Sequence, residues 1–275
     1  MPDSSLQEKH EALRAALERL GRVAVAFSGG ADSTLLLAVA HDALPEAAVL
    51  ALIGRSPSKP RRETEGAVSF CEQHGIQHRV IDTHEFEIAG FDHNPEDRCY
   101  LCKREMFSEF SEAARACGFD HLVEGSNADD AASWRPGERA LSELHVASPL
   151  RDAGLSKAQV RALSKELGLP TWDKPSYSCL LSRFEYGQAI TPERLAAVDA
   201  SELALIELGF SQVRVRVAGD DARVELSRDD IERAARPNLR AAIVEALRRH
   251  GFVHVSLDLV GYRFGSMDEG HTPAR

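Results

Sequence analysis

The sequence lacks the long apolar runs of membrane-spanning proteins, because nowhere do about eighteen apolar residues follow one another. It also lacks a secretory signal peptide: the N-terminus is polar and acidic, where a signal would need a cationic start and then an apolar stretch. We therefore expect a cytoplasmic protein with no membrane partner.

Positive charge is scarce as well. The 275 residues contain 33 Lys and Arg against 43 Asp and Glu, which gives a formal net charge of −10. This balance disfavours the broad basic surface that binds nucleic-acid phosphates. We expect a small anionic substrate and no nucleic-acid partner. The length allows one large domain, or one large and one small domain.

The cysteines are few and odd in number, which argues against a framework of disulfides. Two of the five, Cys99 and Cys102, form a C-x-x-C motif that is typical of metal or redox chemistry in an intracellular protein. Cys71 and Cys117 lie within apolar helical patterns, and we interpret both as small buried hydrophobic residues.

The N-terminal part of the chain alternates apolar strands with amphipathic helices. Residues 23–27 are apolar at every position, which is typical of a strand covered on both faces in a parallel sheet. The order predicts an α/β fold with a doubly wound, mostly parallel sheet. The predicted strands span residues 23–27, 48–53, 78–82, 121–124 and 145–149, and the predicted helices span residues 5–20, 34–44, 61–74, 103–117 and 156–168.

The pattern changes across an irregular stretch, residues 169–187, that is rich in Pro, Ser, Lys and Arg. Beyond it, the order helix, strand, strand, helix, strand predicts a smaller α+β domain. We therefore divide the chain into a nucleotide-binding domain, residues 1–185, that includes the cysteine loops, and a domain for substrate binding or oligomerisation, residues 186–275. The predicted elements of the second domain are helices at residues 191–209 and 229–250 and strands at residues 212–217, 223–226 and 253–257.

A glycine-rich turn, Ser-Gly-Gly-Ala-Asp-Ser, joins the first strand to its helix. Backbone N–H groups and the helix dipole favour an anion at such a place, and an aspartate beside phosphate needs a cation such as Mg²⁺. The turn fits neither a Walker loop nor a dinucleotide loop, and a plain structural turn is the alternative. The candidate phosphate and metal ligands are Ser28, Gly29, Gly30, Asp32 and Ser33.

In this position the order S-G-G-x-D-S resembles the PP-loop of the ATP pyrophosphatase superfamily. The resemblance implies that the nucleotide is ATP, that pyrophosphate is released and that AMP is transferred to a substrate oxygen. A second polar turn, residues 124–130, follows a later strand, and we expect Asn127 and Asp129 to help bind the nucleotide or its metal. A simple capping turn is the alternative there. The loop at residues 54–59 would pass the adenine or ribose.

A third cysteine has unusual surroundings. Cys179 lies in the irregular stretch, between Lys174 and Arg183. A lone C-x-x-C is compatible with zinc, a redox disulfide, an iron–sulfur cluster or chance. If Cys179 folds back onto Cys99 and Cys102, three thiolates can hold a 4Fe–4S cluster with one iron open.

Five separated segments, taken in order, resemble the LarE family, and the resemblance spans nearly the whole chain. The segments are the PP-loop, N-P-x-x-R-C-Y-x-C-K from Asn94, E-G-S-N-A-D-D from Glu124 with a later W-R-P-G, K-P-S-x-x-C-L-x-S-R from Lys174, and R-V-R-V from Arg214. Members of this family insert sulfur during assembly of the nickel-pincer nucleotide cofactor.

The resemblance implies a reaction on pyridinium-3,5-biscarboxylic acid mononucleotide, in which ATP adenylates a carboxylate, pyrophosphate leaves, and sulfur displaces AMP. Some members sacrifice the sulfur of one cysteine, at the position of Cys179, and others hold a 4Fe–4S cluster on three cysteines. Because Cys99 and Cys102 are also present, we place this chain with the cluster-bearing type. We expect Cys179, Asp32 and Arg183 to be catalytic, and the family resemblance implies a homo-oligomer.

Two arginines of the last motif, Arg214 and Arg216, occupy alternate positions of a predicted strand and so share one face. We expect them to bind the mononucleotide phosphate, together with Ser182 and Glu202. The alternative is a solvated strand face with salt bridges to Glu225 or Glu202.

Other functions remain open at this point. Trp134 is a candidate for stacking on a base or pyridinium ring, and a core or subunit contact is the alternative. A tRNA thiolase of the PP-loop superfamily is the nearest rival enzyme, although the acidic charge balance disfavours it. An ammonia-using ligase has no need of the cysteines, and a non-enzymatic protein that binds adenine nucleotides or a cluster would use the same loops.

Overall fold

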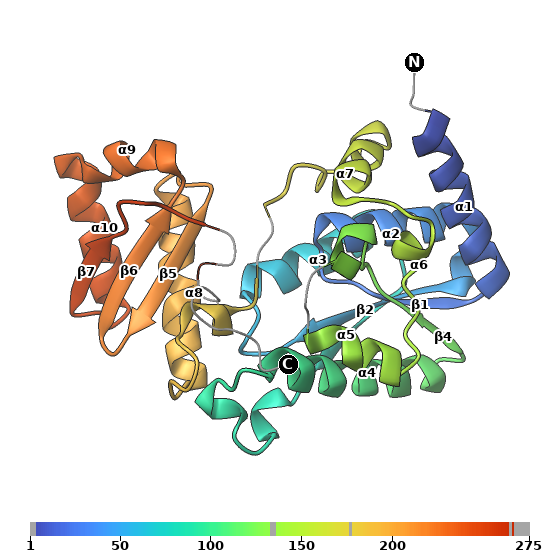
Figure 1. The fold of residues 1–275 in the computed structure, drawn as a ribbon, viewed down its shortest axis with the longest axis horizontal. Helices are drawn as coiled ribbons and strands as arrows, with labels where there is room; N and C mark the ends of the chain where they lie inside the picture. The colour runs from blue at the N-terminus through green and yellow to red at the C-terminus, as the bar shows by residue number, and fades with distance from the viewer. Residues whose placement is uncertain (1–3, 133–135, 176–177, 264–265, 267–275) are drawn as a thin grey trace. The chain divides into compact units, whose positions relative to one another are not determined.

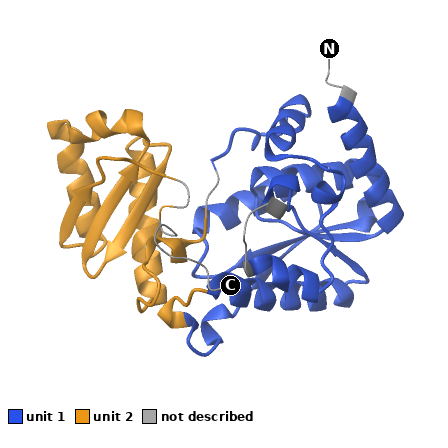
Figure 2. Cartoon of the chain, viewed as in Figure 1, with its two compact units in different colours: residues 1–91, 97–177 blue, residues 92–96, 178–275 orange. Residues whose placement is uncertain are grey.

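The computed structural model describes residues 4–132, 136–175, 178–263 and 266. Contacts divide the chain into two compact units (Figure 2). The first unit comprises residues 1–91 and 97–177, and the second comprises residues 92–96 and 178–275. A compact unit is not by itself a functional domain, so the division into residues 1–185 and 186–275 stays a prediction.

The first unit is built on a four-stranded parallel sheet. Its strands lie in the order β3-β2-β1-β4, and each neighbouring pair is parallel. The expected α/β fold with a parallel sheet is therefore confirmed (Figure 1). The strands are β1 (Val23–Ala26), β2 (Val49–Arg55), β3 (His78–Asp82) and β4 (His121–Val123).

Helices cover both faces of this sheet (Figure 1). Successive side chains of a strand point to opposite faces, so Val23 and Val25 enter one apolar cluster while Ala24 and Ala26 enter the other. This explains why β1 is apolar at every position. The first cluster is covered by α1 (Ser4–Leu20), α2 (Ala31–Ala43), α3 (Arg61–Gln73) and α7 (Lys157–Glu166), and the second by α4 (Arg98–Ala116) and α5 (Pro136–Glu143).

The predicted strand at residues 145–149 is wrong. Ala147 forms one isolated parallel bridge to Val123, and the short helix α6 (Pro149–Asp152) begins directly afterwards. Proline lacks the N–H that a strand ladder uses, whereas it suits the first turn of a helix. Helix α4 also begins at Arg98, before the predicted start at residue 103, so the C-x-x-C motif lies inside the helix.

The second unit contains a three-stranded sheet in the order β5-β6-β7, with β6 antiparallel to β5 and parallel to β7. This matches the predicted order of a small α+β domain. The predicted helix at residues 229–250 is broken at Pro237, because proline cannot continue a helical hydrogen-bond ladder. The elements are α8 (Pro192–Glu207), β5 (Val213–Ala218), β6 (Asp221–Leu226), α9 (Ile231–Ala235), α10 (Pro237–Arg249) and β7 (His254–Leu257).

The described residues also form short 3₁₀ helices, at Glu46–Ala48, Glu85–Glu87, Phe91–His93, Ala128–Ala132, Leu180–Arg183 and Arg228–Asp230. Within the described residues, no helix is both long and apolar enough to cross a membrane.

Candidate active site

The strand order of the first unit reverses at β1. The chain runs from β1 to β2 and β3 on one side, and then returns to β4 on the other side of β1. In open α/β sheets, ligands bind at the carboxyl ends of the strands beside such a reversal. The loops after β1 and β4 touch there, because a Cβ built on Gly125 would lie 3.0 Å from the Ser33 backbone nitrogen. The candidate site is the crevice between these two loops.

Gly125 offers a direct test of this placement. In Gly125→Ala the new methyl group would push the two loops apart, so the affinity for the expected nucleotide, ATP, should fall about tenfold, which corresponds to about 1.4 kcal/mol of binding free energy. Overpacking of this kind also lowers folding stability by about 1–3 kcal/mol. Gly66→Ala is the matched control: it lies in α3, and a Cβ there would meet nothing within 4 Å. Calorimetric titration with ATP measures both variants, and equal affinities would contradict the placement.

Hydrogen bonds of two serine hydroxyls join the two ends of the phosphate loop. The Oγ atoms of Ser28 and Ser33 are 3.0 Å apart, and the Ser33 hydroxyl donates to the Gly30 carbonyl at 3.2 Å. Gly29 has a φ of +71°, a left-handed conformation that glycine adopts without strain. Helix α2 follows directly, and no described side chain caps its N-terminus. Its first N–H groups are therefore placed to bind an anion.

Asp32 lies in a polar network that joins the two loops. Its Oδ1 accepts a hydrogen bond from Asn127 Nδ2 at 3.2 Å, and its Oδ2 forms an ion pair with Lys157. The Asp129 backbone N–H donates to Asn127 Oδ1 at 3.0 Å, and Asp129 Oδ2 accepts from the Lys157 backbone N–H at 2.9 Å. Asn127 and Asp129 are therefore connected to the phosphate loop. Their contact with a nucleotide stays a prediction.

A cavity of about 260 Å³ opens beside the phosphate loop. Lys59, from the loop after β2, and Lys103 of α4 bring positive charge to its wall. Such a wall suits phosphate groups, and the aromatic and thioether side chains of α4 suit a flat base. The other lining residues are Ala26, Phe27, Ser28, Gly30, Asp32, Ser33, Met106, Phe107, Phe110, Glu124, Gly125, Ser126 and Asp130.

The C-x-x-C motif lies in the first turn of α4. Cys99 is four residues before Lys103, and Cys102 is four residues before Met106, and residues four apart share one face of a helix. The two cysteines therefore continue the cavity-lining face, about one 5.4 Å turn further toward the helix N-terminus. Cys99 is exposed and Cys102 is half-buried, which leaves both within reach of a ligand.

The two remaining cysteines of the first unit have structural positions. Cys71 is fully buried, as expected, and burial with the nearby Glu72 charge raises the pKa of its thiol to about 12. Cys117 is half-buried rather than fully buried as predicted, and it packs against the apolar cluster beneath α4. A fully buried thiol with a raised pKa is a poor nucleophile, so we assign Cys71 to the core.

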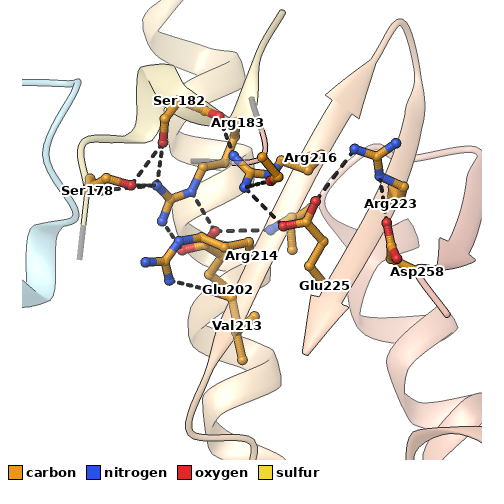
Figure 3. Close-up of polar contacts among 12 residues, drawn as sticks. Ser178, Ser182, Arg183, Glu202, Val213, Arg214, Arg216, Arg223, Glu225 and Asp258 are labelled. Atoms are coloured by element: carbon orange, nitrogen blue, oxygen red, sulfur yellow. Dashed lines mark hydrogen bonds and ion pairs between the residues drawn. The ribbon is translucent and has the colours of Figure 1, made fainter. Parts of the chain in front are cut away.

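In the second unit, Arg183 is fully buried and fixes the segment that carries Cys179 (Figure 3). Its Nε and Nη2 donate to the two carboxylate oxygens of Glu202 at 2.8 and 3.0 Å. Its Nη1 lies 2.9 to 3.0 Å from the carbonyl oxygens of Ser178 and Cys179 and from the hydroxyls of Ser178 and Ser182. These contacts give Arg183 a positioning role toward Cys179, and its predicted catalytic role stays a prediction.

Arg214 and Arg216 lie on one face of β5, and only 1% and 7% of them is exposed. The face is therefore buried rather than solvated. Arg216 Nη2 donates to Glu225 Oε2 at 2.9 Å, and its Nη1 donates to the Ser182 carbonyl (Figure 3). The Arg214 guanidinium lies 4.8 Å from the centre of the Tyr262 ring, and burial and the Arg183 charge lower the pKa of Arg214.

The predicted site residues thus fall into two groups, one in each unit. The first group comprises Ser28, Gly29, Gly30, Asp32, Ser33, Asn127, Asp129, Cys99 and Cys102, and the second comprises Cys179, Ser182, Arg183, Glu202, Arg214 and Arg216.

Within the described part of the chain, no three His, Cys, Asp or Glu side chains are grouped as a metal ion requires. Trp134 lies outside the described residues.

Sequence reasoning missed three lysines of the first unit as site residues: Lys59, Lys157 and Lys174. Lys59 lines the cavity, Lys157 pairs with Asp32, and Lys174 donates to the Gly29 carbonyl. Lys59 lies in the loop that was expected to pass the adenine or ribose, and Lys174 begins the motif around Cys179, but sequence spacing does not show which lysine side chains reach the phosphate loop.

Comparison with known proteins agrees with this geometry. A family model described as NAD synthase matches residues 6–112, which include β1, the phosphate loop and most of α4. The NH(3)-dependent NAD(+) synthetase of Methanopyrus kandleri is 28% identical over 62% of this chain and 62% of its own length. The region that matches the family model therefore includes the phosphate loop.

Two relatives match the chain almost from end to end. An uncharacterised protein of Synechocystis is 40% identical over 96% of this chain and 98% of its own length. The pyridinium-3,5-bisthiocarboxylic acid mononucleotide synthase of Lactiplantibacillus plantarum is 37% identical over 99% of this chain and 98% of its own length. The resemblance found in the motifs is confirmed, and the chain belongs to the LarE family of PP-loop proteins.

Proposed function

We propose that this protein is an ATP-dependent sulfurtransferase that converts a carboxylate of pyridinium-3,5-biscarboxylic acid mononucleotide into a thiocarboxylate. The observation that carries the proposal is the uncapped phosphate loop at the sheet reversal, in a chain that is 37% identical to a pyridinium-3,5-bisthiocarboxylic acid mononucleotide synthase over nearly its full length. This places the protein in cofactor biosynthesis.

The reaction has two steps. A carboxylate oxygen of the acceptor attacks the α-phosphorus of ATP, pyrophosphate leaves, and an acyl adenylate forms. A sulfide or the Cys179 thiolate then attacks the acyl carbon, and AMP leaves with the carboxylate oxygen. On the thiolate route, loss of the Cys179 Cα proton then breaks its Cβ–Sγ bond, which releases the thiocarboxylate and leaves dehydroalanine. The N–H groups at the start of α2 hold the pyrophosphate end of ATP, and Lys59 and Lys103 neutralise charge that develops on the leaving group.

Mg²⁺ fits the first unit, because carboxylate and amide oxygens are the ligands it prefers. The carboxylates of Asp32 and Asp130 line the cavity, whereas Asn127 contacts Asp32 through its amide nitrogen and is not a ligand in this proposal. Asp32 also pairs with Lys157, so this ammonium balances its charge when no cation is bound. In the proposal Asp32 and Asp130 hold the ion, which supplies charge neutralisation for the phosphates.

We propose that Cys99, Cys102 and Cys179 together hold a 4Fe–4S cluster, with two of the ligands in the first unit and one in the second. Cys99 and Cys102 are three residues apart in one helical turn, so both thiols project from the same side of α4. Cys179 is half-buried and completes the set in our proposal. A cluster held by three cysteines would keep one iron open for an additional sulfide.

Anaerobic purification followed by iron and sulfide analysis tests the cluster. We expect about four irons and four sulfides per chain in the unmodified protein, as the cluster formula requires. Loss of the cluster in Cys102→Ala but not in Cys117→Ala would support the ligand set. A colourless, iron-free and fully active protein would contradict it.

We propose that the acceptor phosphate binds at the buried face of β5. Three buried guanidinium groups, of Arg183, Arg214 and Arg216, face two buried carboxylates, of Glu202 and Glu225. Buried charge is costly unless it is balanced, so this excess of positive charge favours a bound anion. Ser182 adds a hydroxyl next to Arg183.

Arg214→Ala is expected to weaken binding of the mononucleotide about tenfold to a hundredfold, because hydrogen bonds to charged groups contribute about 1.5–3 kcal/mol. ATP binding should not change, since the phosphate loop belongs to the first unit. Titration with each ligand measures both affinities, and thermal melting checks the fold. The matched control is Arg223→Ala, at a half-exposed position on the neighbouring strand. Equal loss of both affinities would count against the assignment.

A tRNA thiolase is the alternative that uses the same adenylation chemistry. The two proposals are separated by incubating the protein with ATP and either the mononucleotide or unmodified tRNA, and by measuring AMP release. We expect release with the mononucleotide and none above background with tRNA. The reverse result would replace the proposal with the thiolase.

A further inference from the structure

The carbonyl of Gly29 receives a charged hydrogen bond from outside the phosphate loop. Lys174 Nζ lies 2.9 Å from this oxygen, although Lys174 is far away in the sequence. Gly29 itself is buried against α3, since a Cβ built on it would lie 3.3 Å from the Ala67 Cβ. The loop backbone is therefore held between α3 and a lysine.

The ammonium of Lys174 is fixed by further contacts. It forms an ion pair with Glu63 Oε2 of α3 at 2.8 Å, and the two side chains are only 25% and 17% exposed. Arg161 of α7 donates to the Lys174 carbonyl at 2.8 Å and to the Trp172 carbonyl at 3.3 Å, which anchors the backbone on both sides of residue 173. These contacts hold the Lys174 side chain in a defined position beside the phosphate loop.

A peptide bond is planar and trans, so its C=O and N–H groups point in opposite directions. Fixing the Gly29 carbonyl toward Lys174 therefore turns the Gly30 N–H away from the lysine. That N–H donates a long hydrogen bond to Ser28 Oγ, with 3.4 Å between nitrogen and oxygen, and Ser28 and Gly30 both line the cavity. A cation on the carbonyl also polarises the peptide and makes the N–H a stronger donor.

We infer that Lys174 is a positioning residue for nucleotide activation: it orients and polarises the Gly29–Gly30 peptide so that its N–H binds the pyrophosphate portion of ATP. This inference rests on the proposed function and adds to it a residue that contacts the loop from its far side. Because the N–H faces charge that grows as pyrophosphate leaves, the effect falls on the rate as well as on binding.

The pair of Lys174 with Glu63 contributes little to folding, because partly exposed ion pairs are worth about 0–1 kcal/mol. Lys174→Met should therefore fold with a nearly unchanged melting temperature. Lys165→Met is the matched control: its ammonium lies 4.5 Å from the centre of the Trp172 ring, in the same region, and α7 carries it. Lys174→Arg retains the charge and tests for rescue.

The experiment is calorimetric titration with inorganic pyrophosphate, followed by acceptor-dependent AMP release at varied ATP. We expect Lys174→Met to lose about tenfold in pyrophosphate affinity and about 10–100-fold in kcat/KM for ATP, with a fall in kcat itself. Lys165→Met should behave as the unmodified protein, and Lys174→Arg should recover most of the loss.

The outcomes separate the two proposals. Normal pyrophosphate binding and normal AMP release in Lys174→Met would overturn the role of Lys174 and leave the proposed function intact. Failure of the unmodified protein to bind pyrophosphate would overturn the proposed function and this role together. If Lys174→Met does not fold, Lys174→Gln replaces it, and the same loss of affinity is expected because the amide carries no charge.

Discussion

Cys179→Ala is expected to abolish thiocarboxylate formation, with a loss of at least about 10³-fold, as is usual when a reacting nucleophile is removed. Acceptor-dependent release of pyrophosphate should persist, because the phosphate loop and its cavity belong to the first unit, whereas Cys179 belongs to the second. The adenylate would then be lost slowly to water. Mass spectrometry of the acceptor and a pyrophosphate assay measure the two steps separately.

The control for this prediction is Cys117→Ala, which removes a half-buried thiol from the apolar cluster beneath α4. It should retain both steps at nearly the normal rate. The cluster and the sacrificial routes both require Cys179, so the prediction holds for either. Thiocarboxylate formation at the normal rate in Cys179→Ala would refute the role of this residue.

Arg183→Met is expected to destabilise the second unit by about 3–5 kcal/mol, which is the usual cost of leaving a buried charge without its partner. Both side chains of the Arg183–Glu202 pair are fully buried, and the guanidinium also fixes the backbone at Ser178 and Cys179. Urea unfolding measures the change. Arg223→Met is the control, since that side chain is half-exposed and its loss should cost about 0–1 kcal/mol.

The double variant Arg183→Met/Glu202→Gln separates lost packing from unpaired charge. It should recover part of the stability, because the carboxylate that Arg183 leaves behind is then neutral. A single variant as stable as the unmodified protein would show that this pair does not hold the Cys179 segment.

The same pair gives stability a defined pH dependence. Burial alone would raise the pKa of Glu202, but the charge and hydrogen bonds of Arg183, with Arg214, lower it. The ionised Glu202 therefore contributes its full share of the folding stability above the ordinary glutamate pKa of about 4.3. This contribution is lost as the pH falls through the lowered pKa that Glu202 has in the folded protein.

The parts of the fold that follow from local patterns were predictable. The continuous apolar run of β1 predicted a strand buried on both faces, and its alternate residues do enter two separate clusters. The glycine-rich turn before α2 predicted the phosphate loop. The bend at Pro237 and the start of α6 at Pro149 also follow from proline chemistry, although the predicted helix and strand ran past both residues.

Contacts between distant segments were not predictable. Lys157 and Lys174 contact the phosphate loop from segments more than a hundred residues away in the sequence. Lys174 begins the motif around Cys179 and Lys157 belongs to none of the motifs, but nothing in the sequence shows that either side chain contacts the phosphate loop. The sequence predicted that Arg214 and Arg216 share one face of a strand. Charged residues at alternate strand positions usually face solvent, so their burial was not predictable. It results from the packing of α8 and the loop at residues 178–182 against this face.

The central claim is that ATP activates a carboxylate of the acceptor as an acyl adenylate before sulfur attacks. The most direct measurement uses the mononucleotide with its carboxylates labelled with heavy-isotope oxygen, and mass spectrometry of the AMP that is released. We predict that each AMP carries one heavy oxygen, because the carboxylate oxygen stays on phosphorus when sulfur displaces AMP. AMP without the label, formed together with the thiocarboxylate, would contradict the account.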